Sequence, residues 1–336
     1  MKIADNYPLL SHNTFHIDVK AHQFIEYDTI EELQHLFSHK DLLTYPILHI
    51  GEGSNLLFTK DYEGTVLHSA IHYIQIIRED EEYVEIKAGS GVLWDDFVQY
   101  CIQHNWQGAE NLSLIPGEVG ASAIQNIGAY GVEVKDLITE VEALDTSLQT
   151  MKIFKNADCN YAYRSSIFKQ ELKGKYIVTG VTFRLRKKPL FNLSYGLLNE
   201  ETQKLGDVCL ANIRKAVIAI RESKLPNPAV LGNAGSFFMN PVIEYDFFNR
   251  LQKEHPEMPH YLLPDNKVKI PAGWLIEQCG WKGKQLGRVA VHEKQALVIV
   301  NTGNATGLEI LDFSQQIVTT VKEKFGITIV PEVAII

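Results

Sequence analysis

Residues 115–131 restrict the folds open to this chain more strongly than any other segment. They read IPGEVGASAIQNIGAYG, with Gly117, Gly120, Gly128 and Gly131 among small and mostly apolar side chains. Glycine lets the backbone take positive φ angles and approach a neighbouring group closely, so this backbone could lie against a flat ring. Successive N–H groups in such turns can also point inward and bind an anion. A glycine-rich turn inside a buried core is the other interpretation of the same residues.

A second glycine motif lies upstream, between two apolar stretches. GEGSN at 51–55 follows ILHI at 47–50 and precedes LLF at 56–58, which predicts a strand, a tight loop and a strand. The motif is not Gly-x-Gly-x-x-Gly leading into a helix, so a Rossmann domain is not supported. An ordinary turn would explain one such loop. Two separate loops in a β-rich domain could hold a pyrophosphate from two sides.

Apolar periodicity divides the chain into a β-rich part, up to about residue 186, and a C-terminal α+β part. Residues 83–87 and 176–186 alternate as half-buried strands do, and residues 93–104 favour a helix. A second helix is predicted at 207–222, and a domain boundary follows at 224–228, where two prolines prevent the helix from continuing.

The C-terminal part reads strand–helix–strand–helix–strand–strand–helix–strand. Residues 308–325 carry apolar side chains at spacings of three and four, which is typical of a helix with one buried face. Strands are predicted at 297–300 and 327–330. This order indicates a compact α+β domain.

Composition excludes several classes of protein. The 336 residues suit two or three domains, and 41 acidic against 32 basic residues give a net charge of -9. An acidic chain is a poor nucleic-acid binder, so any anionic ligand must meet locally placed positive groups. The four cysteines are scattered without a CxxC pair, which disfavours a zinc site or a disulfide framework and suits a reducing cytosol. We find no signal-peptide pattern and no membrane-spanning apolar run, so we expect a cytoplasmic protein without a metal.

The two glycine segments resemble the FAD-binding signature of the UDP-N-acetylenolpyruvoylglucosamine reductase (MurB) family, and the resemblance runs from about residue 14 to the C-terminus. It implies an α+β fold: an FAD-binding domain of the p-cresol methylhydroxylase/vanillyl-alcohol oxidase type, followed by a substrate-binding domain. The expected divisions are residues 1–70, with strand 327–336 nearby, 71–225 and 226–326. The resemblance implies that non-covalent FAD is contacted by Gly51, Gly53, Ser54, Asn55, Leu56, Pro116, Gly117, Val119, Gly120, Ala121, Gln125, Asn126 and Gly128.

The activity implied by the resemblance is the reduction of UDP-N-acetylglucosamine-enolpyruvate to UDP-N-acetylmuramate, an oxidoreductase step of bacterial peptidoglycan synthesis that serves cell shape and division. NADPH would reduce FAD and leave, and the enolpyruvyl nucleotide would then take the hydride. We expect a monomeric enzyme that does not enter the membrane. Another FAD-dependent oxidoreductase or oxidase on the same scaffold, and a flavin-binding protein without catalysis, are the alternatives.

Three residues match the catalytic positions of the family. Ser236 lies in NAGSFF and would donate a proton to carbon, whereas a lone Ser after Gly is usually a turn residue. Arg164 lies in YRSSIFK and would clamp the enolpyruvyl carboxylate with its planar fork of donors, although such an Arg is often a surface ion-pair residue. Glu332 lies in the apolar segment IVPEVAII and would polarise the carboxylate, the alternative being an exposed edge-strand residue.

Further residues match positions that contact the sugar nucleotide or the nicotinamide cofactor. They are Tyr130, Tyr163, Tyr195, Lys224, Asn240, Tyr261 and Gln285. The loop that carries Tyr261 resembles the longer subtype of the family, in which a tyrosine loop folds over the substrate. His292 is interpreted as structural.

Three positions depart from the pattern of many family members. Met239 replaces a Lys, Ala123 replaces a Pro, and Ala334 replaces an Arg. None of them is one of the predicted catalytic positions. The departures therefore affect the expected substrate affinity rather than the expected reaction.

Overall fold

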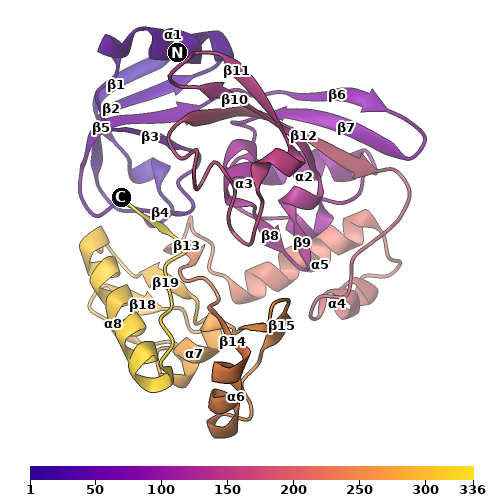
Figure 1. Cartoon of the computed structure of the whole chain (residues 1–336), viewed down its shortest axis with the longest axis vertical. Helices are drawn as coiled ribbons and strands as arrows, with labels where there is room; N and C mark the ends of the chain where they lie inside the picture. Colours follow the sequence, from indigo (N-terminus) through magenta and orange to yellow (C-terminus); the bar gives the residue numbers. More distant parts are fainter. The chain divides into compact units, whose positions relative to one another are not determined.

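The computed structural model describes residues 1–336, which group into two compact units (Figure 1). Both units are discontinuous in sequence. The first unit comprises Met1–Tyr7, Lys20–Gly53 and Tyr62–Ser223, and the second comprises Pro8–Val19, Ser54–Asp61 and Lys224–Ile336. The division after Ser223 lies beside the predicted boundary segment. A further division of the first unit into two domains stays a prediction.

The first unit begins with a four-stranded sheet whose order is β1-β2-β5-β3. Its strands are β1 (Lys2–Pro8), β2 (Lys20–Tyr27), β3 (Ile47–Ile50) and β5 (Tyr62–Ser69). Strand β5 pairs in parallel with both β2 and β3. Helix α1 (Ile30–Ser38) connects β2 to β3 and buries Leu33, Leu36 and Phe37 against this sheet. The carboxyl ends of the three parallel strands therefore share one edge, which is where parallel sheets commonly bind ligands.

The first unit also holds a five-stranded antiparallel sheet of order β11-β10-β12-β7-β6. Its strands are β6 (Ile74–Glu79), β7 (Tyr83–Gly89), β10 (Ile138–Asp145), β11 (Met151–Lys155) and β12 (Tyr176–Arg186). Helices α2 (Trp94–Gln103) and α3 (Val119–Gln125) pack beside it, with Trp94, Phe97 and Phe183 in a common core (Figure 1). The predicted strands 83–87 and 176–186 and the predicted helix 93–104 are confirmed, but β12 is buried on both faces from Ile177 to Phe183.

Smaller elements complete the first unit. They are the hairpin of β8 (Gly128–Ala129) and β9 (Val132–Glu133), α4 (Leu198–Lys204) and α5 (Leu210–Lys224). Helix α5 confirms the helix predicted at 207–222. It buries Ile213, Ala216 and Val217 beside α4, and Tyr130 packs against the same cluster.

The second unit is built on an antiparallel sheet of order β13-β19-β18-β17. Its strands are β13 (Gly232–Ser236), β17 (Gln285–Leu286), β18 (Val289–Val291) and β19 (Val298–Asn301). Helix α8 (Gly307–Phe325) contacts β18 and β19, begins at a Thr306–Glu309 capping box and ends at Gly326. The predicted helix is confirmed, because five of its apolar residues at spacings of three and four form a buried face: Ile310, Phe313, Ile317, Val321 and Phe325.

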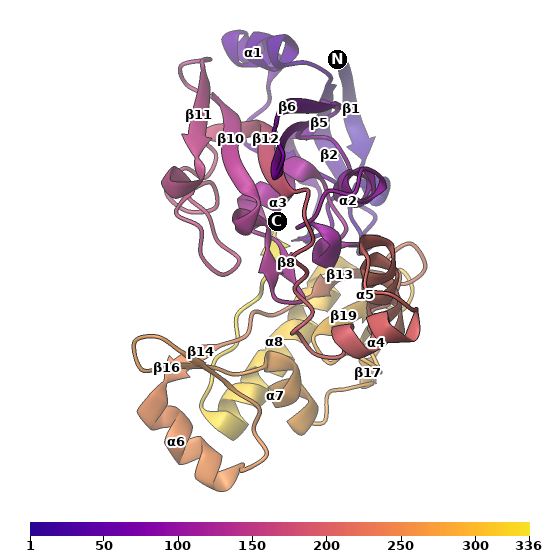
Figure 2. The ribbon, with the colours of Figure 1, turned by 90° about the vertical axis from the view of Figure 1, so that its right-hand side faces the viewer.

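A second, smaller sheet of order β14-β16-β15 carries α6 (Figure 2). The elements of this part are β14 (Val242–Glu244), α6 (Tyr245–Glu254), β15 (Tyr261–Leu263), β16 (Lys267–Lys269) and α7 (Ala272–Gln278). The chain ends with β20 (Ala334–Ile335), which pairs in parallel with β4 (Leu56–Leu57).

Two local predictions were wrong. The segment 115–131 was interpreted as loop, yet it contains α3, whose first N–H groups bond to carbonyls outside the helix. Residues 327–330 form no strand, although Ile327 and Ile329 are buried in the predicted alternation. They run beside Met239, whose N–H bonds to the carbonyl of Val330, and Pro331 follows without an N–H of its own. None of the helices combines the length and apolar character needed to cross a bilayer.

Candidate active site

The first glycine loop starts at the carboxyl end of β3. Gly53 has a φ of 67°, a conformation that favours glycine. Gly53 is the last residue of one segment of the first unit, and the next segment, Ser54–Asp61, belongs to the second unit. Within the second unit, the carbonyl of Asn55 accepts a hydrogen bond from the N–H of Ala334 (3.0 Å), and its side-chain amide donates to the carbonyl of Glu332 (3.3 Å). The predicted cofactor residue Asn55 thus fixes the segment that carries Glu332.

The second glycine segment is held by the loop between β7 and α2. The N–H groups of Val119 and Gly120 donate to the carbonyls of Val92 (2.9 Å) and Ser90 (3.0 Å). A Cβ on Gly120 would lie 2.8 Å from the Cβ of Ser90, so only glycine fits there without a shift. Gly117 has a φ of 113°. The N–H groups of Val119 and Gly120 therefore form hydrogen bonds within the chain, and both residues stay predicted cofactor contacts.

The structure brings the predicted residues Arg164, Asn126 and Gly128 together. The Arg164 guanidinium donates from Nη2 to the carbonyl of Gly128 (2.8 Å) and from Nη1 to that of Asn126 (3.3 Å). The Asn126 side chain is buried and donates to the carbonyl of Ala162 (2.8 Å). Lys169 connects Gln125 to Arg164, because its ammonium donates to the Gln125 side chain (2.7 Å) and to the carbonyl of Arg164 (3.1 Å).

Three predicted tyrosines lie in the first unit. The ring of Tyr130 packs edge-on against that of Tyr195, with 6.2 Å between centroids. The Arg164 guanidinium lies over the Tyr163 ring at 5.5 Å. Tyr163 and Tyr195 are exposed by 38% and 48%, so a ligand can reach both rings.

Sequence reasoning missed Arg221, on α5. Burial lowers the pKa of its guanidinium, the charges of Tyr130 and Asp95 raise it, and the charge of Arg164 lowers it again. Burial likewise raises the pKa of Tyr130, against the charge of Arg221. The Nε atom of Arg221 is buried without a hydrogen-bond partner. The available signal was its position seven residues after Arg214, which puts both on one face of a predicted helix.

In the second unit, Ser236 and Glu332 are held on adjoining segments. The N–H of Glu332 donates to the carbonyl of Phe237 (2.8 Å), and Phe238 forms a bridge with Pro331. Phe237 and Phe238 are buried, which anchors the backbone that carries Ser236. Glu332 itself is partly buried and precedes β20 instead of lying in a continuous strand. Arg164 belongs to the first unit.

The predicted substrate residues of the second unit lie on four different segments. Asn240 accepts from the N–H of Ala272 at Oδ1 (2.9 Å), and Gln285 donates to the carbonyl of Gly287 (2.9 Å). Lys224 is exposed at the start of the last segment of this unit. Tyr261 is 49% exposed on β15, with the Lys269 ammonium 5.4 Å from its ring centre.

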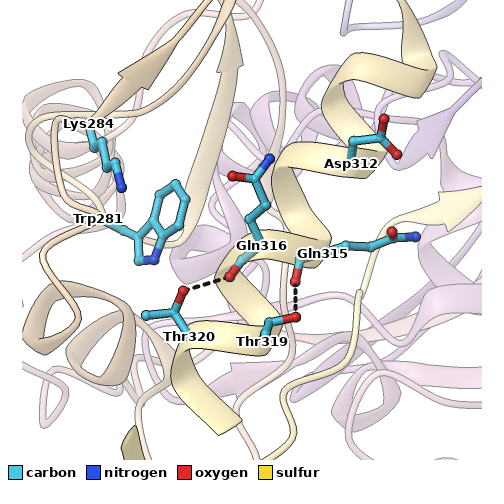
Figure 3. A pocket seen from close by; sticks show the side chains of 7 residues that line it. All are labelled: Trp281, Lys284, Asp312, Gln315, Gln316, Thr319 and Thr320. Carbon is cyan, nitrogen blue, oxygen red and sulfur yellow. Dashed lines mark hydrogen bonds between the residues drawn. The ribbon is translucent and has the colours of Figure 1, made fainter. Parts of the chain in front are cut away.

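A separate hollow of about 710 Å³ lies beside α8 (Figure 3). The Lys284 ammonium lies 4.0 Å from the ring centre of Trp281 at one side of it. The hydroxyls of Thr319 and Thr320 are turned back to carbonyls of their own helix. Its lining is Trp281, Lys284, Asp312, Gln315, Gln316, Thr319 and Thr320, none of which is a predicted site residue.

Family models match both parts of the chain. Residues 21–150 match an FAD binding domain, and residues 227–336 match the C-terminal domain of UDP-N-acetylenolpyruvoylglucosamine reductase. These matches confirm the FAD-binding domain and the C-terminal domain expected from the sequence.

Relatives of the same name match over almost the whole chain. A Bacteroides fragilis UDP-N-acetylenolpyruvoylglucosamine reductase is 54% identical over 331 residues, covering 98% of this chain and 99% of its own. A Porphyromonas gingivalis relative is 48% identical, covering 99% of each chain. The crystal structure of a Thermus caldophilus reductase has the same fold, with a TM-score of 0.69 at 22% identity over 99% of this chain and 98% of its own. The chain therefore belongs to the UDP-N-acetylenolpyruvoylglucosamine reductase family.

Proposed function

We propose that this chain reduces the enolpyruvyl group of UDP-N-acetylglucosamine-enolpyruvate to form UDP-N-acetylmuramate for peptidoglycan, with FAD as cofactor and NADPH as electron donor. The observation that carries the proposal is the pairing of the Ser236 and Glu332 segments through the Glu332 N–H and the Phe237 carbonyl, 2.8 Å apart. It places a hydroxyl and a carboxylate on neighbouring, anchored backbones. Such a pair suits a reaction that protonates carbon beside a carboxylate.

The residues of the first unit fit FAD. Two buried polar atoms near Tyr130 have no partner within the chain, the acceptor Asn111 Oδ1 and the donor Arg221 Nε. The Asn111 side-chain nitrogen donates to the carbonyl of Tyr130 (2.9 Å), and this hydrogen bond fixes the position of the Asn111 Oδ1 atom. Buried polar atoms without partners are uncommon in folded proteins, and a bound ligand is one way of satisfying them.

When bound, FAD would supply the transfer of hydride from NADPH to the vinyl carbon of the substrate. Gly51, Gly53 and the glycine segment around Gly117 and Gly128 would hold this non-covalent cofactor. Their positive φ angles at Gly53 and Gly117 turn the backbone toward a ligand without side chains in the way.

The roles of the three catalytic residues follow from their chemistry. Arg164 binds the enolpyruvyl carboxylate, because a planar guanidinium matches a carboxylate with two donors. When the hydride arrives, negative charge develops on the carbon beside that carboxylate. Arg164 and Glu332 together polarise the carboxylate and so stabilise this charge. Ser236 donates the proton to carbon, and its positioning depends on Gly235, whose φ is 67°.

Binding of the nucleotide uses the remaining predicted residues. Lys224 is a cation suited to the pyrophosphate, and Asn240 and Gln285 supply amide groups. Tyr130 and Tyr163 contact the substrate, and Tyr195 contacts the nicotinamide cofactor and the substrate phosphate in turn. Tyr261 covers the sugar nucleotide. We further propose that the enzyme acts in the cytoplasm as a monomer.

The test is NADPH oxidation by the purified, FAD-loaded protein, with and without UDP-N-acetylglucosamine-enolpyruvate. We expect sustained oxidation only with the nucleotide. Reducible FAD without any stimulation by the nucleotide would overturn the substrate assignment. Oxygen consumption with an alcohol or sugar would instead assign the chain to an oxidase.

A further inference from the structure

A cluster of ionisable side chains lies where the parallel strands of the first unit end. Glu26 lies near the end of β2, His68 near the end of β5, and Glu52 in the loop after β3. Glu118 joins them as the residue directly before α3. None of these four residues belongs to the predicted catalytic or binding positions.

His68 is held between two carboxylates. Its Nδ1 lies 3.0 Å from Oε2 of Glu26, and its Nε2 lies 2.8 Å from Oε1 of Glu118. A neutral imidazole donates from one nitrogen only, so both contacts are hydrogen bonds to carboxylates only when the ring is protonated. The side chains are 16% exposed for His68 and 6% for Glu118, so water screens this pair weakly.

Two glutamates of the cluster, Glu118 and Glu52, connect the two glycine loops. Oε2 of Glu118 lies 3.0 Å from the point where a Cβ on Gly51 would be, so the carboxylate packs against the glycine backbone. In the reverse direction, Oε2 of Glu52 accepts a hydrogen bond from the N–H of Gly117 at 2.6 Å. Each loop therefore contacts the other through a glutamate side chain, and His68 fixes one of these glutamates, Glu118.

The charge balance of the cluster depends on one proton. Glu26, Glu52 and Glu118 are the acidic side chains of the cluster, and His68 is the basic side chain that touches two of them. Burial and, to a smaller extent, the charge of His68 lower the pKa of His49 to about 3, so His49 adds no positive charge. A deprotonated His68 would leave carboxylates unbalanced beside loops that must hold an anionic pyrophosphate.

The titrations of His68 and Glu118 change the stability of the folded chain in the same direction. Burial lowers the pKa of His68, but the hydrogen bonds and charges of Glu118 and Glu26 outweigh it and raise the pKa overall. Burial raises the pKa of Glu118, His68 lowers it, and the charge of Glu52 raises it. Because both pKa values are raised in the folded chain, the stabilisation is present at low pH and is lost as the pH rises through them.

Other groups around the pair do not replace this cation. The charge of His72 has a small lowering effect on the pKa of Glu118. Burial raises the pKa of Tyr27, whose hydroxyl bonds to His49 (2.7 Å), so the phenol stays neutral. The ring of Phe24 stacks on that of His68 at 6.3 Å. No group of three or more His, Cys, Asp or Glu side chains is arranged to hold a metal ion.

We propose that His68 is a positioning residue for the cofactor: its protonated ring joins Glu26 to Glu118 and lets the two glycine loops accept the FAD pyrophosphate, so FAD is held less tightly as the pH rises. The inference rests on the proposed assignment of these loops to FAD. It adds a proton-dependent contribution to FAD affinity from residues that need not touch the cofactor.

The experiment is a titration of the apoprotein with FAD, followed by quenching of FAD fluorescence, from about pH 5.5 to about pH 9. For the natural chain we expect the dissociation constant to rise roughly tenfold across this range, as a single charge acting at about 10 Å would cause. His68→Gln should bind about tenfold more weakly at the acidic end and lose most of the pH dependence. The double variant His68→Gln/Glu118→Gln should recover affinity, since it removes the unbalanced carboxylate together with the cation.

His22→Gln is the matched control, because His22 lies exposed on β2 outside the cluster. It should retain the pH dependence of the natural chain. A dissociation constant of the natural chain that does not change with pH would overturn the inference, as would a loss in His68→Gln that is equal at all pH values and not rescued by Glu118→Gln. A natural chain that binds no FAD at any pH would overturn the proposed function as well, so the two failures are distinguishable.

Discussion

Asp95 and Arg214 form an ion pair through two parallel hydrogen bonds, Nη1 to Oδ1 at 2.7 Å and Nη2 to Oδ2 at 2.8 Å. The pair joins the first turn of α2 to α5, the helix that also carries Arg221. Asp95 Oδ1 accepts a third hydrogen bond from the N–H of Leu114, at 2.6 Å. One carboxylate therefore connects both helices to the start of the glycine segment.

Asp95→Asn is expected to lower the free energy of unfolding by about 1–3 kcal/mol, because Arg214 loses its charged partner while partly buried. Burial raises the pKa of Asp95, but Arg214 and the Leu114 N–H outweigh it and lower the pKa overall. The stabilisation is thus present above the ordinary value of 3.8 and is lost as the pH falls through the lowered pKa. Urea unfolding at neutral and acidic pH measures it. Asp96→Asn, an exposed neighbour in the same helical turn, should change little.

Gly120→Ala is expected to destabilise the chain by about 1–3 kcal/mol through overpacking, since the new methyl group would meet the Cβ of Ser90 at 2.8 Å. The cause is contact and not backbone strain, because Gly120 is in α3. Thermal unfolding of Gly120→Ala, Ser90→Gly and the double variant forms a complete cycle. The double variant should be more stable than the sum of the single effects predicts; simple additivity would contradict the contact explanation.

Ser236→Ala is expected to separate the two half-reactions. Reduction of FAD by NADPH should survive, whereas transfer of the hydride to the enolpyruvyl nucleotide should slow by roughly 10²–10⁴-fold for lack of the proton donor. Stopped-flow absorbance of the flavin follows each half-reaction separately. Ser236→Cys keeps an acidic proton at this position and should retain more activity than Ser236→Ala. Normal rates for both half-reactions in Ser236→Ala would remove the serine from its proposed role.

Arg164→Lys is expected to raise the KM for the enolpyruvyl nucleotide roughly tenfold or more, because an ammonium keeps the charge but loses the planar fork. The KM for NADPH should change less, since the carboxylate is a feature of the nucleotide. Arg164→Met removes the charge as well and should act more strongly. Equal effects of Lys and Met on both substrates would indicate that Arg164 only supports the backbone carbonyls of Asn126 and Gly128.

Sequence patterns predict those elements whose boundaries depend on their own apolar periodicity or capping residues. Helix α8 was predicted almost to the residue from its apolar spacing. In the structure, the Thr306–Glu309 capping box and Gly326 set the same boundaries. Helix α3 was missed since its glycine and serine residues have low helix propensity. Its start depends on carbonyls of Val92 and Ser90, which no local pattern reveals.

Only those residues of the candidate site that lie in recognisable motifs could be predicted from the sequence. The motifs around Arg164 and Gly128 lie far apart in sequence, yet they meet through a 2.8 Å hydrogen bond, which gives a physical link between two separate predictions. No motif singles out Arg221 or His68, and Glu118 lies in the glycine segment without being one of its predicted ligand-binding residues. Their importance follows from burial and charge, which depend on the tertiary structure.

The pairing of β20 with β4 has a consequence for synthesis of the chain. The carbonyl of Ile336 accepts hydrogen bonds from the N–H and the hydroxyl of Thr59, which stands 277 positions earlier. Residues 54–61 therefore leave the ribosome long before their partner strand exists, and the second unit cannot close until residues 334–336 have been synthesised. Contacts of such sequence separation form late and slowly. A nascent chain would keep this edge unpaired until residues 334–336 emerge, and a chaperone could bind it during that interval.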